Sequence, residues 1–147
     1  MKSIWQDQWR RDLDARIDKV GDGANPKWGK MTADRMLSHL RESAKMALGD
    51  LPVKSKKLPL RYFPLKQLIV YLVPFPKGAP TAPELLAGSA GPCGPCRTEL
   101  HELLARIVAR ADSAEWPEHP AFGKLSKRGW GVLTYRHFDH HLRQFGV

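Results

Sequence analysis

The chain has 147 residues, enough for a single domain over residues 1–147 with one sizeable core. Its hydrophobic content of 42% is typical of a folded globular protein and excludes a disordered one. The longest apolar run, 68–75, is too short to span a bilayer, and the N-terminus lacks the apolar segment of a secretory signal. We therefore expect a cytoplasmic protein without a membrane partner.

The net charge of +9 has two interpretations. It can provide a soluble basic surface, or it can attract an anionic partner such as nucleic acid or a small acidic substrate. The basic residues are spread along the chain, and no nucleic-acid-binding motif accompanies their one local cluster. This cluster comprises Lys54, Lys56, Lys57 and Arg61. We therefore do not expect nucleic acid as the partner.

The first part of the chain predicts two amphipathic helices. Apolar residues spaced by three and four positions favour a helix over 3–20. The segment 21–26 is rich in Gly, Asp and Pro and predicts a loop. Thr32 is a suitable N-cap for the second helix, and Gly49 marks its end.

The middle of the chain has weaker signals. The apolar segment 62–73 predicts a short helix packed on the other helices, although its composition fits a strand equally well. A Pro/Gly loop is expected at 74–80. Thr81 and Glu84 then have the spacing of a capping box, which predicts a brief helical turn.

The last part of the chain predicts two more long helices. Pro95 can start one that runs to about Asp112. A loop over 113–125 separates it from the last helix, over 126–144. Four substantial helices in one domain predict an all-α fold, a four-helix bundle with an extra short helical segment.

The last helix carries two histidines on one face. His137 and His141 are one turn apart and continue the apolar stripe of Trp130 and Leu133. Buried imidazoles need partners, and two of them one turn apart can bind one divalent cation. Core histidines with ordinary hydrogen-bond partners explain the same pattern without a metal.

A metal would need at least one further ligand. His39 is the best-placed candidate because it lies beside the apolar stripe of the second helix. His101 has polar neighbours, and His119 lies in an expected loop. On the last helix, His140 is rotated by about 100° from its neighbour His141, so we expect it to pack or to meet a different partner.

Two segments resemble the DinB/YfiT-like superfamily of metalloenzymes. Residues 28–40, WGKMTADRMLSHL, are similar to its second-helix entry, and residues 137–144, HFDHHLRQ, resemble its last-helix signature. The chain looks like an uncharacterised branch of that superfamily, a domain of unknown function. The resemblance implies a bundle in up-down-down-up order and a divalent cation, zinc or nickel. The metal-binding histidines that it implies are His39, His137 and His141.

The resemblance also implies an enzyme acting on a small molecule. Characterised members of the superfamily use or transfer low-molecular-weight thiols, so a thiol S-transferase or a hydrolase-type enzyme is expected. Three imidazoles leave metal positions open, as in catalytic sites. The usual signature continues as HHRGQ, whereas this chain has His141-Leu142-Arg143-Gln144, so no particular substrate and no further catalytic residue is inferred.

Non-catalytic alternatives stay open. The protein can instead be a metal-binding or interaction bundle, and its five tryptophans provide material for a homodimer interface. An open metal position facing a solvent-connected pocket would indicate the enzyme, and a closed, dry site the alternative. Of the nearby carboxylates, Glu42 is expected to be a solvated surface charge, and Asp139 faces away from His137 and His141.

The two cysteines, Cys93 and Cys96, have the spacing of a thioredoxin-like dithiol. A helix follows them, and its N-terminus would lower the pKa of Cys93. Redox chemistry of this kind also needs a preceding strand, and residues 87–92 do not read as one. A dithiol redox protein is therefore the weaker hypothesis, beside a loop whose sequence only matches the motif.

Overall fold

The computed structural model describes residues 1–78, 81–88, 91–110, 112 and 115–147. It contains five α-helices, of which four are long, and no strand element within those ranges. The all-α prediction is therefore confirmed. The helices are α1 (Asp7–Asp18), α2 (Ala33–Leu48), α3 (Leu65–Gln67), α4 (Cys93–Ala109) and α5 (Lys127–Gln144).

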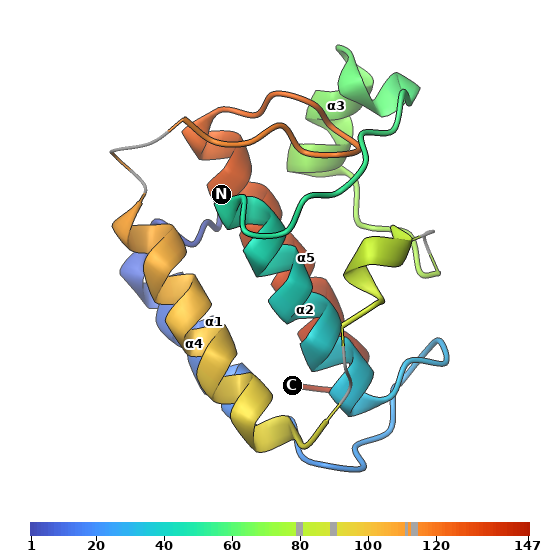
Figure 1. Ribbon diagram of the computed structural model, residues 1–147, viewed down its shortest axis with the longest axis vertical. Coiled ribbons are helices and arrows are strands. Elements are labelled where there is room, and N and C mark those ends of the chain that lie inside the picture. Colours follow the sequence, from blue (N-terminus) through green and yellow to red (C-terminus); the bar gives the residue numbers. More distant parts are fainter. Residues whose placement is uncertain (79–80, 89–90, 111, 113–114) are drawn as a thin grey trace.

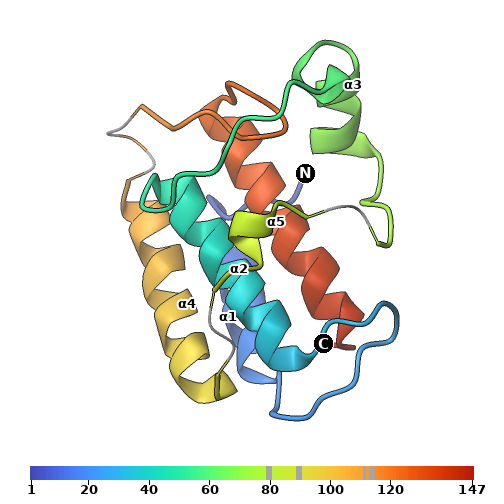
Figure 2. The same cartoon turned by 45° about the vertical axis from the view of Figure 1, so that its right-hand side comes forward.

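The four long helices lie side by side around one core (Figures 1 and 2). Helix α2 packs mainly on α4, and α1 packs on α5. Helices α1 and α5 run in one direction, and α2 and α4 run in the opposite direction (Figure 1). Each long helix contributes fully or almost fully buried apolar side chains to the core: Leu13 and Ile17, Leu37 and Leu40, Leu100 and Leu104, and Phe138 and Leu142.

The helix ends follow from ordinary capping chemistry. Helix α2 begins after Thr32 and ends at Gly49, whose φ of +83° is favourable only for glycine. Helix α5 begins after Ser126, whose Oγ accepts a hydrogen bond from the backbone N–H of Gly129 at 3.1 Å. The Ser126 cap and the end of α2 at Gly49 are confirmed, whereas Thr32 precedes α2 without a capping hydrogen bond from its side chain.

The shorter elements correct two expectations. Residues 65–72 form α3 and then the π-helix η2 (Leu68–Leu72), so the strand alternative for 62–73 is wrong. The turn after Thr81 is the 3-10 helix η3 (Pro83–Leu85), but its N-cap is Ala82 without a side-chain bond. The carboxylate of Glu84 instead accepts a hydrogen bond from the Lys54 N–H at 3.3 Å, so the capping box is absent. A further 3-10 helix, η1 (Pro59–Arg61), precedes α3.

The expected loops are only partly described. Parts of those at 74–80 and 113–125 lie outside the described residues. In the described part of the second, one isolated β-bridge joins His119 and Gly123.

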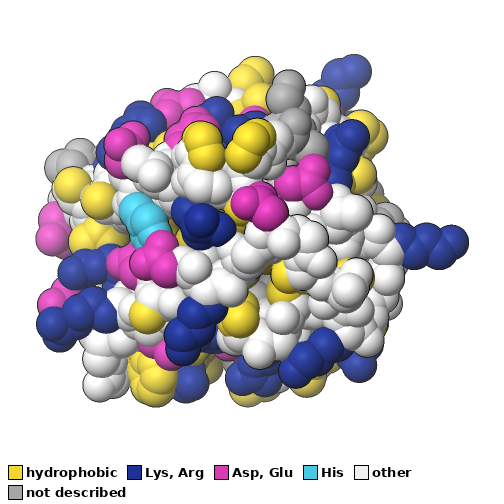
Figure 3. Space-filling view, turned by 90° about the horizontal axis from the view of Figure 1, so that it is seen from below, with side chains coloured by type: hydrophobic (Ala, Val, Ile, Leu, Met, Phe, Trp, Pro, Cys, Tyr) yellow, Lys and Arg dark blue, Asp and Glu magenta, His cyan; other side chains and the backbone are white. Residues whose placement is uncertain are grey.

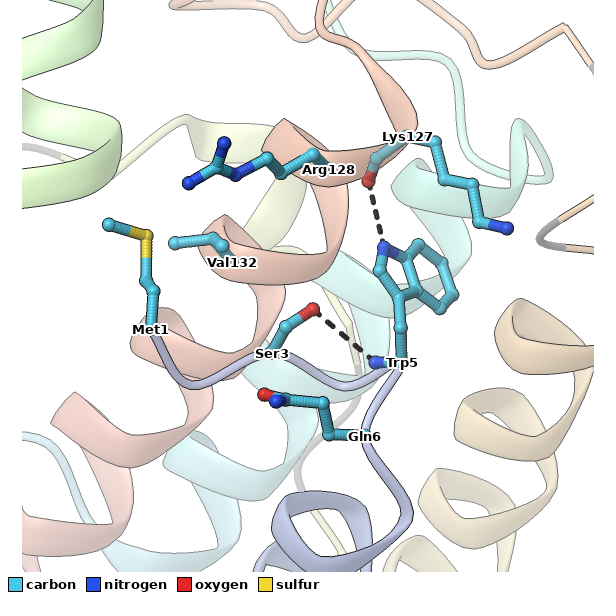
Figure 4. Close-up of a pocket in the computed structure, with 7 residues that line it drawn as sticks. All are labelled: Met1, Ser3, Trp5, Gln6, Lys127, Arg128 and Val132. Atoms are coloured by element: carbon cyan, nitrogen blue, oxygen red, sulfur yellow. Dashed lines mark hydrogen bonds between the residues drawn. The ribbon is translucent and has the colours of Figure 1, made fainter.

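The first helix is shorter than the expected 3–20, because residues before Asp7 pack on α5. The Ile4 N–H donates to the Gly131 carbonyl at 3.2 Å, and Trp5 Nε1 donates to the Lys127 carbonyl at 2.9 Å. Figure 4 shows this contact and a pocket of about 360 Å³ beside it, lined by Met1, Ser3, Trp5, Gln6, Lys127, Arg128 and Val132. The pocket holds no carboxylate, thiol or imidazole, so we assign no chemistry to it.

Within the described residues, no helix combines the length and the apolar character that a membrane crossing requires.

Candidate metal centre

The fold brings three of the predicted histidines together. His39 comes from the middle of α2, and His137 and His141 come from the last two turns of α5. One ring nitrogen from each lies within 4.8 Å of the others. His39 is only 3% exposed, and the other two are half-buried.

The three imidazole rings form a nearly equilateral cluster. Their centroids are separated by 5.0 Å, 4.8 Å and 4.9 Å, and each pair meets edge to face. The Nε2 atoms of His39 and His137 are 3.0 Å apart. Two nitrogens bound tetrahedrally to one zinc at about 2.0–2.1 Å would be about 3.3 Å apart. The His39 and His137 nitrogens therefore have nearly the separation that one small cation requires, and a nitrogen of His141 lies within 4.8 Å of them.

A hydrogen bond orients the His39 ring. Its Nδ1 lies 3.3 Å from the carbonyl oxygen of Leu85 in η3. A carbonyl can only accept, so Nδ1 carries the proton, and Nε2 of the neutral ring is the unprotonated nitrogen that faces His137 Nε2. Metal-ligating histidines commonly have a partner of this kind.

The side chain of Gln144 orients the His141 ring in the same way. Its Oε1 lies 3.1 Å from His141 Nδ1, while its Nε2 donates to the Trp28 carbonyl at 2.9 Å. Because the amide nitrogen faces a carbonyl, the amide oxygen must be the atom facing the ring. His141 Nδ1 is therefore protonated, and its Nε2 has a free lone pair.

The close approach of Gln144 depends on Gly29. This residue has a φ of +76°, and a Cβ built there would lie 3.0 Å from Gln144 Nε2. The loop before α2 therefore lets the Gln144 amide approach closely, and this amide in turn orients the His141 ring.

The electrostatic environment keeps the three rings neutral. Burial lowers the pKa of His39. Burial, followed by the charge of neighbouring His141, holds the pKa of His137 well below its usual value. Burial and then His39 lower the pKa of His141 to about 3. Neutral imidazoles are the form that binds a metal, so the donor set fits a divalent cation.

No carboxylate or thiol in the described part of the chain joins this cluster. Asp139 faces away, as predicted, and pairs with Arg16 at 2.8 Å. Glu42 is not the solvated charge that we expected: it is 7% exposed and pairs with Arg41 at 2.8 Å and Lys45 at 3.6 Å. Its burial was not foreseen because it depends on α4 covering that face of α2.

The other histidines have separate roles. His101 bridges Asp14 and Asp18 of α1, at 2.8 Å from each. His119 is half-buried in its loop, where Nδ1 accepts from the backbone N–H of Ala121 at 3.1 Å. His140 packs edge-on against Trp28 and Phe75, as a non-ligand was expected to do.

A pocket of about 450 Å³ extends to the metal-centre residue His39. It lies between the start of α2 and η3, and two of its lining residues, Lys30 and Arg35, are cationic. The complete lining is Lys30, Met31, Thr32, Arg35, Ser38, His39, Leu85 and Leu86. The pocket could not be predicted from the sequence, because η3 approaches α2 only in the folded chain.

The environment of the cysteines differs from that expected of a redox dithiol. Both are buried in the first turn of α4, and both are free thiols. Burial and neighbouring Asp22, which accepts the Cys93 N–H at 2.9 Å, raise the pKa of Cys93 to about 11. Burial also raises the pKa of Cys96. The expectation that the helix N-terminus lowers the pKa of Cys93 is therefore wrong.

The sequence profile of one family matches most of the chain. It is described as "Protein of unknown function (DUF1569)", and it matches residues 22–146, which contain all three clustered histidines. Neither a curated protein nor a solved structure matches the chain.

Proposed function

We propose that this protein, which belongs to the DUF1569 family of unknown function, is a divalent-metal-dependent enzyme that acts on a small molecule. The observation that carries the proposal is the cluster of His39, His137 and His141, whose ring nitrogens lie within 4.8 Å of one another. We further propose that the domain is a DinB-like four-helix bundle. The opposed directions of the α1/α5 and α2/α4 pairs support an up-down-down-up order.

The second support is the protonation state of the ring nitrogens. The Leu85 carbonyl and the Gln144 amide oxygen each accept a hydrogen bond from an Nδ1–H, so Nε2 is the unprotonated nitrogen of His39 and of His141. A buried imidazole N–H needs an acceptor with or without a metal, but here both acceptors select the same nitrogen, Nδ1. The bonds match the outer partners that orient metal ligands and raise their basicity.

The third support is the incomplete ligand set beside a pocket. Structural zinc sites usually have four protein ligands, whereas catalytic sites keep a position open. Here three imidazoles converge, and the 450 Å³ pocket reaches His39. This combination favours an enzyme over a purely structural metal site.

The residues of the chain then have distinct tasks. A divalent cation such as zinc or nickel, when bound, would supply Lewis acidity and favour the anionic form of a thiol or a water molecule. The three histidines would hold it, and Leu85 and Gln144 would fix their tautomers. Lys30 and Arg35 would attract an anionic group of the substrate into the pocket. Low-molecular-weight thiols that carry carboxylates combine such an anionic group with a thiol. Low-molecular-weight thiols are also the substrate class of the superfamily that the chain resembles.

Cobalt(II) substitution tests the open position. Protein loaded with one Co²⁺ per chain should develop a thiolate-to-cobalt charge-transfer absorption when glutathione is added, with saturation. Uncharged 2-mercaptoethanol should produce the same band. Arg35→Ala should raise the glutathione concentration needed for half-saturation and leave that of 2-mercaptoethanol unchanged.

An arginine on a distant helix provides the matched control. Arg11→Ala on α1 removes an exposed arginine away from the pocket and should leave both titrations unchanged. A cobalt spectrum that neither thiol perturbs would indicate a closed site and support the non-catalytic metal-binding alternative.

A further inference from the structure

An apolar ridge projects from the helices at α3. Residues 62–73 form a knob at the top right of Figures 1 and 2, away from the main helix layers. Its outward side chains are exposed: Phe63 by 80%, Tyr62 by 70% and Leu72 by 67%. We define the ridge as Tyr62, Phe63, Leu65, Leu68, Leu72 and Val73, all of which are exposed large hydrophobic residues.

The ridge follows a short helical segment and the residues just before it. Leu65 lies in α3, Leu68 and Leu72 lie in the π-helix η2 that continues it, and the extended residue Tyr62 precedes α3. The opposite side packs on the protein: Val70 is buried, and Arg136 of α5 donates to the carbonyls of Ile69 and Val70 at 2.7 Å and 2.6 Å. The segment is therefore held in place with one apolar face inward and another outward.

All charged residues in the part of the sequence that contains the ridge are cationic. No acidic residue occurs between Asp50 and Glu84, a stretch that contains six cations. They are Lys54, Lys56, Lys57, Arg61, Lys66 and Lys77. Arg61 pairs with Glu118 at 2.6 Å, and the Lys54 N–H donates to Glu84 at 3.3 Å. Lys57 is exposed, and Lys66 lies within α3 itself.

We propose that the ridge docks the protein on a membrane surface with anionic headgroups. Exposed Tyr, Phe and Leu side chains beside lysines are the composition of interfacial membrane-binding elements. Anionic lipids would attract the lysines, while the apolar side chains enter the boundary between headgroups and acyl chains. This is peripheral docking, and it departs from our sequence-based expectation that there is no membrane partner.

The same charges disfavour a second copy of the chain as the occupant. A two-fold interface would place the ridge against itself and bring the two sets of lysines together. The repulsion would oppose the burial of the apolar side chains. The projecting shape also suits insertion into a soft surface better than contact with a flat one.

Vesicle co-sedimentation of the intact protein tests this inference. We expect binding to vesicles of equimolar phosphatidylcholine and phosphatidylglycerol, and little binding to phosphatidylcholine alone. Phe63→Ser/Leu72→Ser should lower partitioning about tenfold or more by removing inserted apolar area. Lys57→Gln/Lys66→Gln should lower it by about fivefold for each lysine.

A charge-matched control lies at the other end of the molecule. Lys19→Gln/Lys27→Gln changes the net charge equally, in exposed residues next to the bottom loop in Figure 1, and should leave binding nearly unchanged. Circular dichroism checks that each variant is folded. Because neither readout requires the metal, failure of this proposal is independent of the metal centre.

Three results would overturn the proposal. The first is no preference for anionic vesicles. The second is binding that responds to the lysine changes and ignores Phe63→Ser/Leu72→Ser, as expected for nonspecific attraction to polyanions such as nucleic acid. The third is a concentration-dependent dimer that Phe63→Ser/Leu72→Ser dissociates, which would assign the ridge to self-association.

Discussion

At the residue scale, Gln144 links the loop before α2 to a candidate metal ligand. One amide group both accepts from His141 and donates to Trp28, so its orientation is fixed at both ends. In the sequence, Gln144 follows His141 by three residues, close to one helical turn. That spacing could have suggested the contact, but the role of the Trp28 carbonyl depends on a loop conformation that no residue pattern specifies.

We predict that Gln144→Met weakens metal binding without unfolding the protein. Methionine has a similar volume but does not replace the amide oxygen that accepts the hydrogen bond from His141 Nδ1–H. Loss of such a partner typically costs about 10–100-fold in metal affinity. Competition titration with a chromophoric chelator measures the change. Gln8→Met, an exposed position on α1, is the matched control. Equal zinc affinity in the two variants would show that Gln144 does not orient the ring.

We predict that the thiol of Cys93 is unreactive near neutral pH. Its pKa of about 11 leaves few thiolates, so at pH 8 alkylation should be at least about a hundredfold slower than for a thiol with a pKa of 8.5. Mass spectrometry after iodoacetamide treatment of Cys96→Ser, native and in guanidinium, gives both rates. Rapid native alkylation would restore the redox hypothesis.

At the element scale, the N-terminal segment can pack on α5 only because Gly131 has no side chain. A Cβ built at Gly131 of α5 would lie 2.1 Å from Trp5 Nε1 and 2.5 Å from Ser3 Oγ. The first helix was predicted to begin at residue 3, because its apolar pattern starts there. In the structure this helix begins at Asp7, because Ile4 and Trp5 pack against α5 and are not part of the helix.

We predict that Gly131→Ala destabilises the protein by about 1–3 kcal/mol, because the methyl group displaces Trp5. Gly94→Ala in α4 is the matched control, since a Cβ there meets nothing within 4 Å. That change should be neutral or stabilise by up to about 1 kcal/mol. Urea unfolding measures both free energies, and similar values for the two would contradict the packing described for Trp5.

Helices α1 and α4 are joined by a pH-dependent contact at His101. Burial lowers its pKa, but hydrogen bonds to Asp14 and Asp18 raise it more, so the folded pKa lies above the unfolded value of about 6.5. The contact therefore stabilises fully below about pH 6.5 and is lost as the pH rises through the folded pKa.

We predict that His101→Gln lowers stability by about 0.5 kcal/mol at pH 5.5, a small value because solvent screens these half-exposed groups. The difference from the unchanged protein should vanish at high pH. Thermal unfolding at both pH values measures it, and Asp18→Asn should weaken the same dependence. A difference that grows with pH would contradict the bridge.

Most helix positions could be predicted because they depend on local chemistry. Thr32 and Gly49 bound α2, and Ser126 caps α5, as expected. The segment 62–73 was ambiguous because both of its faces are apolar, one against α5 and the other exposed. Only the tertiary contacts decide between a strand and a helix there.

At the scale of the whole molecule, the candidate metal centre joins residues 98 positions apart, His39 and His137. Spacing on one helix predicts the His137 and His141 pair. The position of His39 beside the apolar stripe of the second helix made it the best-placed third candidate, and the family resemblance implied the same residue. The carbonyl of Leu85 and the pocket depend on how η3 folds back over α2, which no periodicity encodes.

The net charge is distributed rather than gathered on the face in Figure 3. Lys and Arg side chains are spread over that face, and Asp and Glu lie among them. Elsewhere on the molecule, charges pair across elements, as Lys45 does with Glu99 at 2.8 Å and Arg106 with Asp50 at 2.8 Å. On this face the +9 charge gives no single basic surface of the kind that nucleic-acid binding would use.

The most direct test of the central claim is the metal content of untagged protein, measured by elemental analysis alongside the His39→Ala/His137→Ala/His141→Ala variant. The metal centre predicts one divalent cation per chain in the unchanged protein and none in the triple variant. His140→Ala, on the same helix but outside the cluster, should retain the metal. Undiminished metal in a folded triple variant, or none in the unchanged protein after zinc or nickel is supplied, would contradict the assignment.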